Sequence, residues 1–531
     1  MVVAVLGAAG LATAGLAVAT PDVAHASTQT GPFPVGNLLS YANSDFEGSV
    51  GDWAPSGSSP NAAISLDTSN SVMHKDSLLD TASAAGISRF RPGGASGALD
   101  ITLPAAGGRY RVGAYFKAPA VSMQTVYFAL HCFTSGGSDL GFTNGSTIHL
   151  NGSGDWQYAE DDITVPSGCF QVEDSPGVVL GNLAAGATVN MDYVIFAPYR
   201  AAVAIGGHGD NCGDGTCGGY SATDWSDSSN SVGPFQTDKE FNDSLTTFGA
   251  TNCSDDESQV GNDPSKFPLC IITYKTPFAS KAAMDAFLST VPDRHDQEII
   301  LVWFQEPEGK DFSYCGKTGA AAFKCETEQQ AAYLHASRYD TPNILIAQDS
   351  AGSWYLNNAG CDWITPSSST GSGVDLYLVD HYENKQVDGT NVNTETDGGH
   401  DYTKWQHWLN CASQQNRPLG FGEYGLDNSP ILLGQQTDPP VCNEPPHTNS
   451  QGATVTNAQE VASAQRADNS YLETLPTSGD PDLATPEPFL VWNYWYSNWG
   501  GMPVCDVFND KYGAVTEWQS IENQNGGQVG G

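Results

Sequence analysis

A chain of 531 residues is too long for one hydrophobic core, so we expect at least two domains. It carries 21 Lys and Arg against 60 Asp and Glu, a formal net charge of -39 at pH 7. This charge disfavours nucleic acid, anionic membranes and acidic polysaccharides as partners, and it leaves a neutral sugar polymer open. With 58 Gly and 30 Pro, the composition favours β-structure with long loops over helical bundles.

The N-terminus has the features of a secretory signal peptide, which we assign to 1–26. Residues 2–19 are small and apolar, and residues 24–26 form an A-x-A-like cleavage site before Ser27. Because no Lys or Arg precedes the apolar run, a membrane anchor stays open as the alternative, although Ala and Gly make a weak membrane span. We expect a secreted, extracellular protein with no membrane contact after cleavage.

Residues 35–198 predict a β-sandwich. Short runs with period-two alternation are separated by Gly, Ser and Asn, a pattern typical of antiparallel strands. The clearest runs are 109–118, 125–133, 146–152 and 188–197. Trp53, Tyr127 and Trp156 could be stacking platforms for sugar rings, but core packing is the favoured interpretation of each.

From 199 to 531, strand-like runs alternate with helical ones, which predicts a parallel sheet covered by helices. Apolar strands are expected at 201–207, 268–275, 298–305, 343–349, 374–380, 418–424 and 488–495. Helices are expected at 239–249, 280–291, 326–337, 402–412 and 456–473. The first helix would place Phe241, Leu245 and Phe248 on one face, and Ser280 would cap the second.

Seven strands are evident, and we expect an eighth between 207 and 268. The predicted fold class is therefore a multidomain β and α/β protein, with an N-terminal jelly-roll β-sandwich followed by a (β/α)8 TIM barrel. An open doubly wound sheet is the alternative, but no G-x-G-x-x-G follows the first strand.

Twelve cysteines, an even number in an exported chain, predict disulfides. Sequence neighbours suggest the pairs Cys132–Cys169, Cys212–Cys217, Cys253–Cys270 and Cys315–Cys325. The remaining four, whose pairing stays open, are Cys361, Cys411, Cys442 and Cys505. No paired C-x-x-C or H-x-x-x-H spacing indicates zinc, so we expect no metal site and no cofactor.

Two carboxylates follow apolar strands. Residues 301–305 lead into Glu306, and residues 418–422 lead into Glu423. In a barrel, the carboxyl ends of the strands line one functional face, so both side chains would reach the same cleft. Retaining glycoside hydrolysis needs a protonated acid and an ionised carboxylate about 5 Å apart, a role that two Glu in different environments can share. Glu308 is the rival for the acid.

These motifs resemble clan A glycoside hydrolases, whose barrels carry the acid/base at the end of strand four and the nucleophile at the end of strand seven. Residues 305–307 are similar to the strand-four motif Asn-Glu-Pro, and residues 422–425 to the strand-seven motif. The resemblance implies Glu306 as acid/base and Glu423 as nucleophile. Gln305 stands where the clan usually has Asn, and we expect it to reach a substrate hydroxyl.

The N-terminal region resembles the jelly-roll carbohydrate-binding modules of secreted polysaccharide-degrading enzymes. The similarity lies in residues 37–53, 155–166 and 191–197. It implies sugar binding, with a passive spacer as the alternative.

Residues at other strand ends are further candidates for substrate binding. The clan resemblance implies that Tyr382 or His381 contacts the nucleophile, and that Trp492 or Trp495 lies under the scissile sugar. We add the remaining candidates His208, Tyr274 and Asp349 because they end other predicted strands.

The sequence thus predicts a secreted, monomeric, retaining glycoside hydrolase that cleaves β-linked bonds of a plant or microbial cell-wall polysaccharide. A catalytically silent carbohydrate-binding protein is the alternative, because Gln305 departs from the clan motif. A transglycosidase using the same two Glu is a third possibility. No G-x-S-x-G turn is present for a serine hydrolase of the α/β fold.

Overall fold

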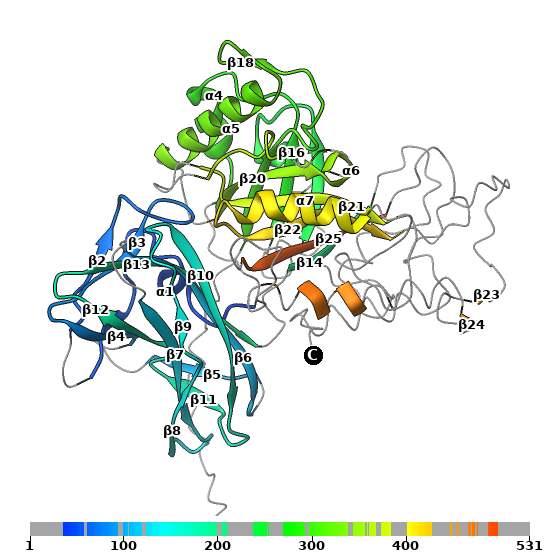
Figure 1. Ribbon diagram of the computed structural model, residues 1–531. Coiled ribbons are helices and arrows are strands. Elements are labelled where there is room, and N and C mark those ends of the chain that lie inside the picture. The colour runs from blue at the N-terminus through cyan, green and yellow to red at the C-terminus, as the bar shows by residue number, and fades with distance from the viewer. Residues whose placement is uncertain are drawn as a thin grey trace, which may run out of the picture.

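The computed structural model has two parts, a β-sandwich and a barrel of parallel strands (Figure 1). It describes residues 36–57, 61–93, 99–104, 106–118, 124–198, 204–209, 237–251, 253, 269–292, 297–337, 343–355, 358, 360–367, 373–383, 401–426, 447–448, 454–455, 463, 466–468, 470–472, 475 and 487–496. The predicted signal peptide lies outside them. Within these ranges, no helix combines the length and apolar character needed to cross a bilayer.

Two antiparallel sheets form the sandwich. The first sheet runs β1 (Trp53–Pro55), β4 (Gly86–Pro92), β12 (Gly177–Leu183), β7 (Thr125–Phe133), β11 (Gln171–Glu173) and β5 (Asp100–Thr102), and β8 (Asp139–Asn144) and β9 (Ile148–His149) also pair with β7. The second sheet runs β10 (Trp156–Val165), β6 (Gly108–Lys117), β13 (Thr188–Pro198), β3 (Ser77–Thr81) and β2 (Ile64–Asp67), and the short helix α1 (Tyr41–Ser44) precedes both. The sequence alternation therefore predicted this part correctly.

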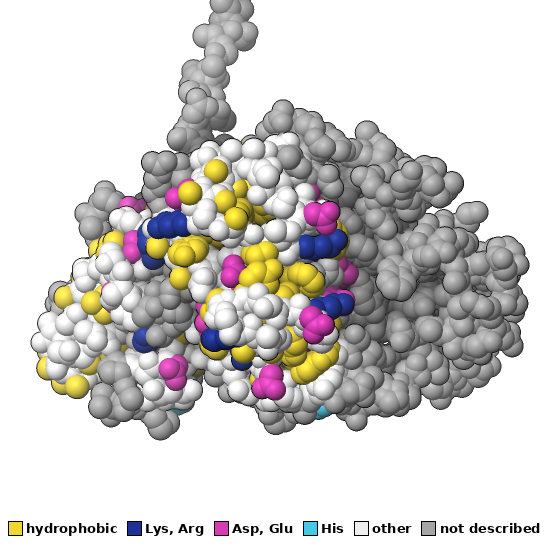
Figure 2. All heavy atoms as spheres, turned by 90° about the horizontal axis from the view of Figure 1, so that it is seen from above, with side chains coloured by type: hydrophobic (Ala, Val, Ile, Leu, Met, Phe, Trp, Pro, Cys, Tyr) yellow, Lys and Arg dark blue, Asp and Glu magenta, His cyan; other side chains and the backbone are white. Residues whose placement is uncertain are grey.

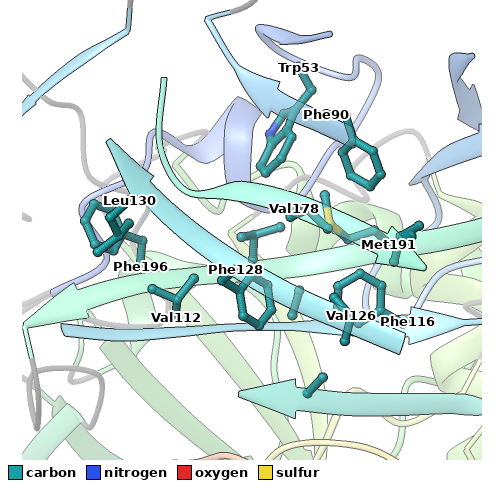
Figure 3. Close-up of a cluster of buried hydrophobic side chains, with 14 of the residues drawn as sticks. Trp53, Phe90, Val112, Phe116, Val126, Phe128, Leu130, Val178, Met191 and Phe196 are labelled. Carbon is teal, nitrogen blue, oxygen red and sulfur yellow. The ribbon is translucent and has the colours of Figure 1, made fainter. Parts of the chain in front are cut away.

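The sandwich core lies between the two sheets (Figure 3). Along β7, buried Val126, Phe128 and Leu130 alternate with less buried neighbours, as expected for a strand with one face inward. Trp53 is 4% exposed and packs edge-on against Phe90. Trp53 and Trp156 (2% exposed) therefore belong to the interior, which confirms the core packing favoured from the sequence.

Eight parallel strands close into the barrel. In order around the ring they are β14 (Ala204–Gly209), β15 (Thr237–Asn242), β16 (Leu269–Tyr274), β17 (Glu298–Trp303), β20 (Ile344–Ala351), β21 (Leu376–Glu383), β22 (Leu419–Leu426) and β25 (Phe489–Tyr496). All seven strands expected from the sequence are present. The last strand pairs with the first over six residues, which closes the ring.

The expected helix at 239–249 is wrong. Residues 237–242 form β15, which pairs in parallel with β16 along its whole length and supplies the missing second strand of the barrel. The helical spacing of Leu245 and Phe248 instead reflects packing around a short 3-10 turn, η1 (Phe248–Ala250), on the outside of the barrel. Pairing with a neighbouring strand overrode the local pattern.

Helices cover the barrel beside several strands. They are α4 (Lys281–Leu288), α5 (Gly319–Ala336), α6 (Gly352–Tyr355) and α7 (Asp401–Ser413), and short hairpins are formed by β18 (Ser313–Tyr314) with β19 (Lys317–Thr318) and by β23 (His447–Thr448) with β24 (Thr454–Val455). The predicted cap is confirmed, because the Ser280 hydroxyl accepts a hydrogen bond from the backbone N–H of Ala283 at 3.2 Å. The helix expected at 456–473 lies largely outside the described residues.

Four disulfides are described. Three were predicted, and the fourth joins two cysteines whose partners were open: Cys132–Cys169, Cys253–Cys270, Cys315–Cys325 and Cys361–Cys411. The predicted pair Cys212–Cys217 lies outside the described residues, as do Cys442 and Cys505.

The second sheet of the sandwich packs against the amino-terminal ends of the barrel strands. One apolar cluster contains side chains from both parts, including Tyr193 from β13, Leu269 from β16 and Ile300 from β17. Across this boundary the hydroxyl of Tyr115 donates to the carboxylate of Glu487 at 2.5 Å. The sandwich therefore covers the end of the barrel where the strands begin. It does not cover the end that carries their carboxyl termini.

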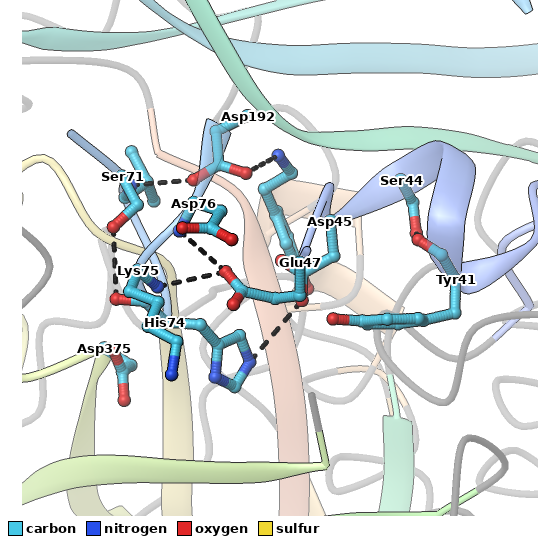
Figure 4. A network of polar contacts seen from close by, with 12 residues as sticks. Tyr41, Ser44, Asp45, Glu47, Ser71, His74, Lys75, Asp76, Asp192 and Asp375 are labelled. Carbon is cyan, nitrogen blue, oxygen red and sulfur yellow. Dashed lines mark hydrogen bonds and ion pairs between the residues drawn. The ribbon is translucent and has the colours of Figure 1, made fainter. Parts of the chain in front are cut away.

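A buried polar network lies beside this boundary (Figure 4). His74 contacts the carboxylate of Asp45 at 3.6 Å, and its ring lies 6.5 Å from that of His335 on helix α5. His335 in turn contacts Asp375 at 3.3 Å, just before β21. Burial raises the pKa of Glu298 at the start of β17, and His74 acts in the opposite direction. His74 of the sandwich thus lies among carboxyl groups of both parts.

Among the described residues, acidic side chains do not form a single patch on the face seen from above. There, acidic and basic side chains of described residues are interspersed with apolar and neutral ones (Figure 2).

We predict that Tyr115→Phe lowers the free energy of unfolding by about 1–3 kcal/mol, because it removes the donor to buried Glu487. Urea unfolding of the full chain would measure this loss. Tyr127→Phe, in the half-buried face of the other sheet, is the control and should change stability by less than about 0.5 kcal/mol. Equal stability of Tyr115→Phe and wild type would show that this contact does not stabilise the boundary.

Candidate active site

Glu306 and Glu423 lie at the carboxyl ends of two barrel strands. Counting β14 as the first strand, β17 is the fourth and β22 the seventh, as the sequence order predicted. Glu306 follows the end of β17 by three residues, and Glu423 lies within β22. Both therefore belong to the end of the barrel opposite the sandwich, where barrels carry their sites.

The backbone at Glu306 is strained. Its φ is 49° and that of Phe304 is 58°, in the left-handed region that residues other than Gly rarely adopt. Two hydrogen bonds hold this shape, from Phe304 N–H to the Tyr274 carbonyl (2.8 Å) and from Glu306 N–H to the Asp349 carbonyl (3.1 Å). Such strain, about 1–3 kcal/mol per residue, persists where neighbouring structure imposes it and is concentrated at functional sites.

A bulge in β22 directs Glu423 inward. Val379 of β21 pairs with Phe421, but the next residue, Asp380, pairs with Glu423, so Gly422 is an extra residue. Strict alternation would place Glu423 on the side of Phe421, which packs outside the barrel against helix α7. A Cβ at Gly422 would collide with the Asp349 carboxylate. The position therefore requires glycine.

Lys239 binds three carboxylates inside the barrel. Its Nζ lies 2.5 Å from Asp349, 2.9 Å from Glu423 and 3.3 Å from Asp380. The ammonium group and both Asp side chains are buried, and Glu423 is 4% exposed. Burial lowers the pKa of Lys239, but the three negative charges more than offset it, so the pKa lies above its usual value.

Gln305 connects two of these carboxylates. Its amide Nε2 donates to Asp380 and, at 2.5 Å, to Oε1 of Glu423. Its expected contact with a substrate hydroxyl stays a prediction, because its amide donors here point to the protein. Gln305 and Lys239 together fix the orientation of the Glu423 carboxylate.

The surroundings of Glu306 favour its protonated form. Burial raises its pKa, as do the charges of Glu423 and Asp349, while Lys239 and Lys310 act in the opposite direction. Its partial exposure leaves the carboxyl within reach of a ligand.

Glu308, the rival acid, is oriented differently. It is 6% exposed and accepts a hydrogen bond from the Ala351 N–H at 2.9 Å, and burial raises its pKa to about 7. This contact ties the loop after β17 to the end of β20. The geometry therefore favours Glu306 as the acid.

Several predicted substrate-binding residues do not gather at this site. Tyr274 is buried against the helix layer, and its hydroxyl donates to Gln330 at 2.7 Å. His381 stacks on Phe421, and Trp492 packs edge-on against Tyr424, both outside the barrel. Of these candidates the structure brings Asp349 to the two glutamates. The structure does not describe the side chains of the other three candidates, His208, Tyr382 and Trp495.

Sequence reasoning missed Lys239 and Asp380. Lys239 lay in the segment expected to be helical, where a Lys is unremarkable. A charged residue within a strand flanked by apolar strands would have been the signal, because burial of charge requires partners.

Among the described residues, one group of three side chains has ligand atoms close enough together to bind a metal ion. It consists of Glu240, Cys253 and Cys270, but the two cysteines are joined to each other in a disulfide. Their sulfur atoms are therefore not thiolate ligands.

Comparisons with known proteins found no match to a family model and none to a curated protein. Among solved structures, the chain is similar to a Clostridium thermocellum endo-1,4-β-D-xylanase 10B with CBM22-1 and GH10 modules, complexed with xylohexaose (10% identity, 89% of this chain and 95% of that one, TM-score 0.34). It is also similar to a ruminal GH26 endo-β-1,4-mannanase (11% identity, 84% and 90%, TM-score 0.32). The module TmCBM61, complexed with β-1,4-galactotriose, matches 29% of this chain and 95% of its own (20% identity, TM-score 0.20). With TM-scores below 0.5, these likenesses carry no weight for the function.

We predict that Gly422→Ala lowers the free energy of unfolding by about 1–3 kcal/mol, because its methyl group displaces the Asp349 carboxylate from Lys239. Urea unfolding would measure the loss. Gly249→Ala, where a Cβ meets nothing within 4 Å, is the matched control and should stay within about 0.5 kcal/mol of wild type. A Gly422→Ala protein as stable as this control would show that the close approach is not required.

Proposed function

We propose that this protein is a retaining glycoside hydrolase that cleaves β-linked bonds of a cell-wall or plant polysaccharide. The observation that carries the proposal is the placement of Glu306 and Glu423 at the carboxyl ends of the fourth and seventh barrel strands. The charge of Glu423 helps to raise the pKa of Glu306, so the two carboxyl groups interact. One of them can hold a proton while the other is ionised.

In this mechanism Glu423 attacks the anomeric carbon and forms a glycosyl ester. The bond from that carbon to the glycosidic oxygen breaks, and the oxygen takes both its electron pair and the proton of Glu306. Glu306, now ionised, then removes a proton from water, which attacks the anomeric carbon and releases Glu423.

The proposal includes the architecture expected from the sequence. The barrel would be a (β/α)8 catalytic domain at 199–531, and 35–198 would be a jelly-roll module that holds the enzyme on its polymer. The eight parallel strands and the two-sheet sandwich support both assignments. Secretion, a monomeric state and independence from cofactors belong to the same proposal.

A catalytically silent carbohydrate-binding protein is the second candidate. It is favoured by one observation, the use of both Gln305 amide donors on Asp380 and Glu423. The same experiments distinguish it from the hydrolase.

We predict that Glu306→Gln and Glu423→Gln each lower kcat on the cleaved polymer by at least about a hundredfold. Wild type and both variants would be assayed on glucans, mannans, xylans and galactans, and proton NMR would identify the anomer formed first. Glu308→Gln is the matched control and should lose far less. Full activity in either variant would contradict the assigned roles, and binding without hydrolysis by wild type would support the silent protein.

We predict that kcat/KM of wild type falls as the pH rises through the raised pKa of Glu306, because the leaving oxygen needs the protonated acid. In Glu306→Gln this basic limb should disappear for an aryl glycoside whose leaving group needs no proton. A basic limb that persists unchanged in this variant would assign the acid to another group.

A further inference from the structure

One ammonium group faces three carboxylates in the interior of the barrel. Lys239, Asp349 and Asp380 have buried charged groups, and Glu423 is 4% exposed. If all four groups were charged, three negative charges would face one positive charge, and the cluster would carry a net charge of two negative units. A buried site tolerates such an excess poorly, because ions lose their hydration there. At least one of these carboxyl groups is therefore expected to hold a proton.

Its surroundings favour Asp380 as that group. Burial raises its pKa well above the usual value, and the charges of Asp349, Glu423 and Glu306 act in the same direction, against that of Lys239. Of the three carboxyl groups, Asp380 is the farthest from Lys239, at 3.3 Å, against 2.5 Å for Asp349 and 2.9 Å for Glu423. Its other oxygen accepts a hydrogen bond from Gln305, a neutral donor.

Asp349 provides an acceptor for this proton. Its Oδ2 pairs with Lys239, whereas its Oδ1 is buried and has no hydrogen-bond donor among the described groups. Burial raises the pKa of Asp349, whereas the charge of Lys239 lowers it, and an O–H group on Asp380 would act in the same direction as Lys239. A protonated Asp380 would satisfy this buried oxygen.

We propose that Lys239, Asp349 and Asp380 form a positioning triad for Glu423, in which Asp380 is a neutral acid and Asp349 is the permanent counterion of Lys239. The inference rests on the proposed role of Glu423 as nucleophile. The ammonium group then keeps a second contact for Glu423, which stays ionised and oriented before the attack.

The triad also accounts for the charge after the attack. When Glu423 becomes an ester it loses its negative charge, and Glu306 gains one as it gives up its proton. Lys239 keeps Asp349 as its partner, so no unpaired cation is left in the interior. The proton of Asp380 is neither consumed nor transferred.

The first test compares Asp349→Asn with Asp380→Asn. Asparagine matches a neutral carboxylic acid in shape and hydrogen bonding, so Asp380→Asn should lower kcat by less than about tenfold. Asp349→Asn removes the counterion of Lys239 and should lower kcat by about a hundredfold or more, with little change in KM. Lys239→Arg should retain more activity than Lys239→Met, and urea unfolding would show which variants fold. Equal losses in the two Asp variants would overturn the proposal.

The second test does not depend on activity. Infrared difference spectra at pH 7 of wild type minus Asp380→Asn should show the carbonyl stretch of a protonated carboxylic acid, and no carboxylate bands. Wild type minus Asp349→Asn should show carboxylate bands. The reverse pattern would overturn the proposal. If wild type hydrolyses no glycan but the spectra are as expected, the proposed function fails while the protonation of the triad stands.

Discussion

The contact of the Lys239 ammonium group with Asp349, Asp380 and Glu423 joins four strands of the barrel at one level of its interior. Below this level the interior is apolar and continuous with the boundary to the sandwich. Above it, Gln305 and Glu306 reach partial exposure. A buried charge without its partners is costly, so the cluster constrains how these strands pack. The site is thus part of the barrel interior.

The two ends of the barrel are used differently. At the amino-terminal ends, the sandwich covers the strands with apolar contacts and with polar ones such as the hydrogen bond from Tyr115 to Glu487. At the carboxyl ends, the glutamates converge. This division matches the general arrangement of parallel barrels, in which one end serves stability and the other serves chemistry.

Two local departures from regular backbone bring the glutamates into position. Glu306 adopts a left-handed conformation that a hydrogen bond to the Asp349 carbonyl supports, and the extra residue Gly422 turns Glu423 inward. Both devices cost stability and are maintained by the strands around them. Strand β20 contacts both segments. The backbone carbonyl of its residue Asp349 accepts a hydrogen bond from Glu306, and the Asp349 side chain lies against Gly422 of β22.

By itself, the sequence determined the two-part organisation, seven barrel strands, three disulfides and the strand order of Glu306 and Glu423, because alternation, apolar runs and neighbouring cysteines are local signals. Only the tertiary structure decided the rest. β15 formed because β16 lies beside it, although its residues suggested a helix. His381 and Trp492 point away from the site, because the strand end fixes a residue's level but the bulge and pleat decide its face. The partners of Lys239 come from distant segments, and no local pattern encodes their meeting.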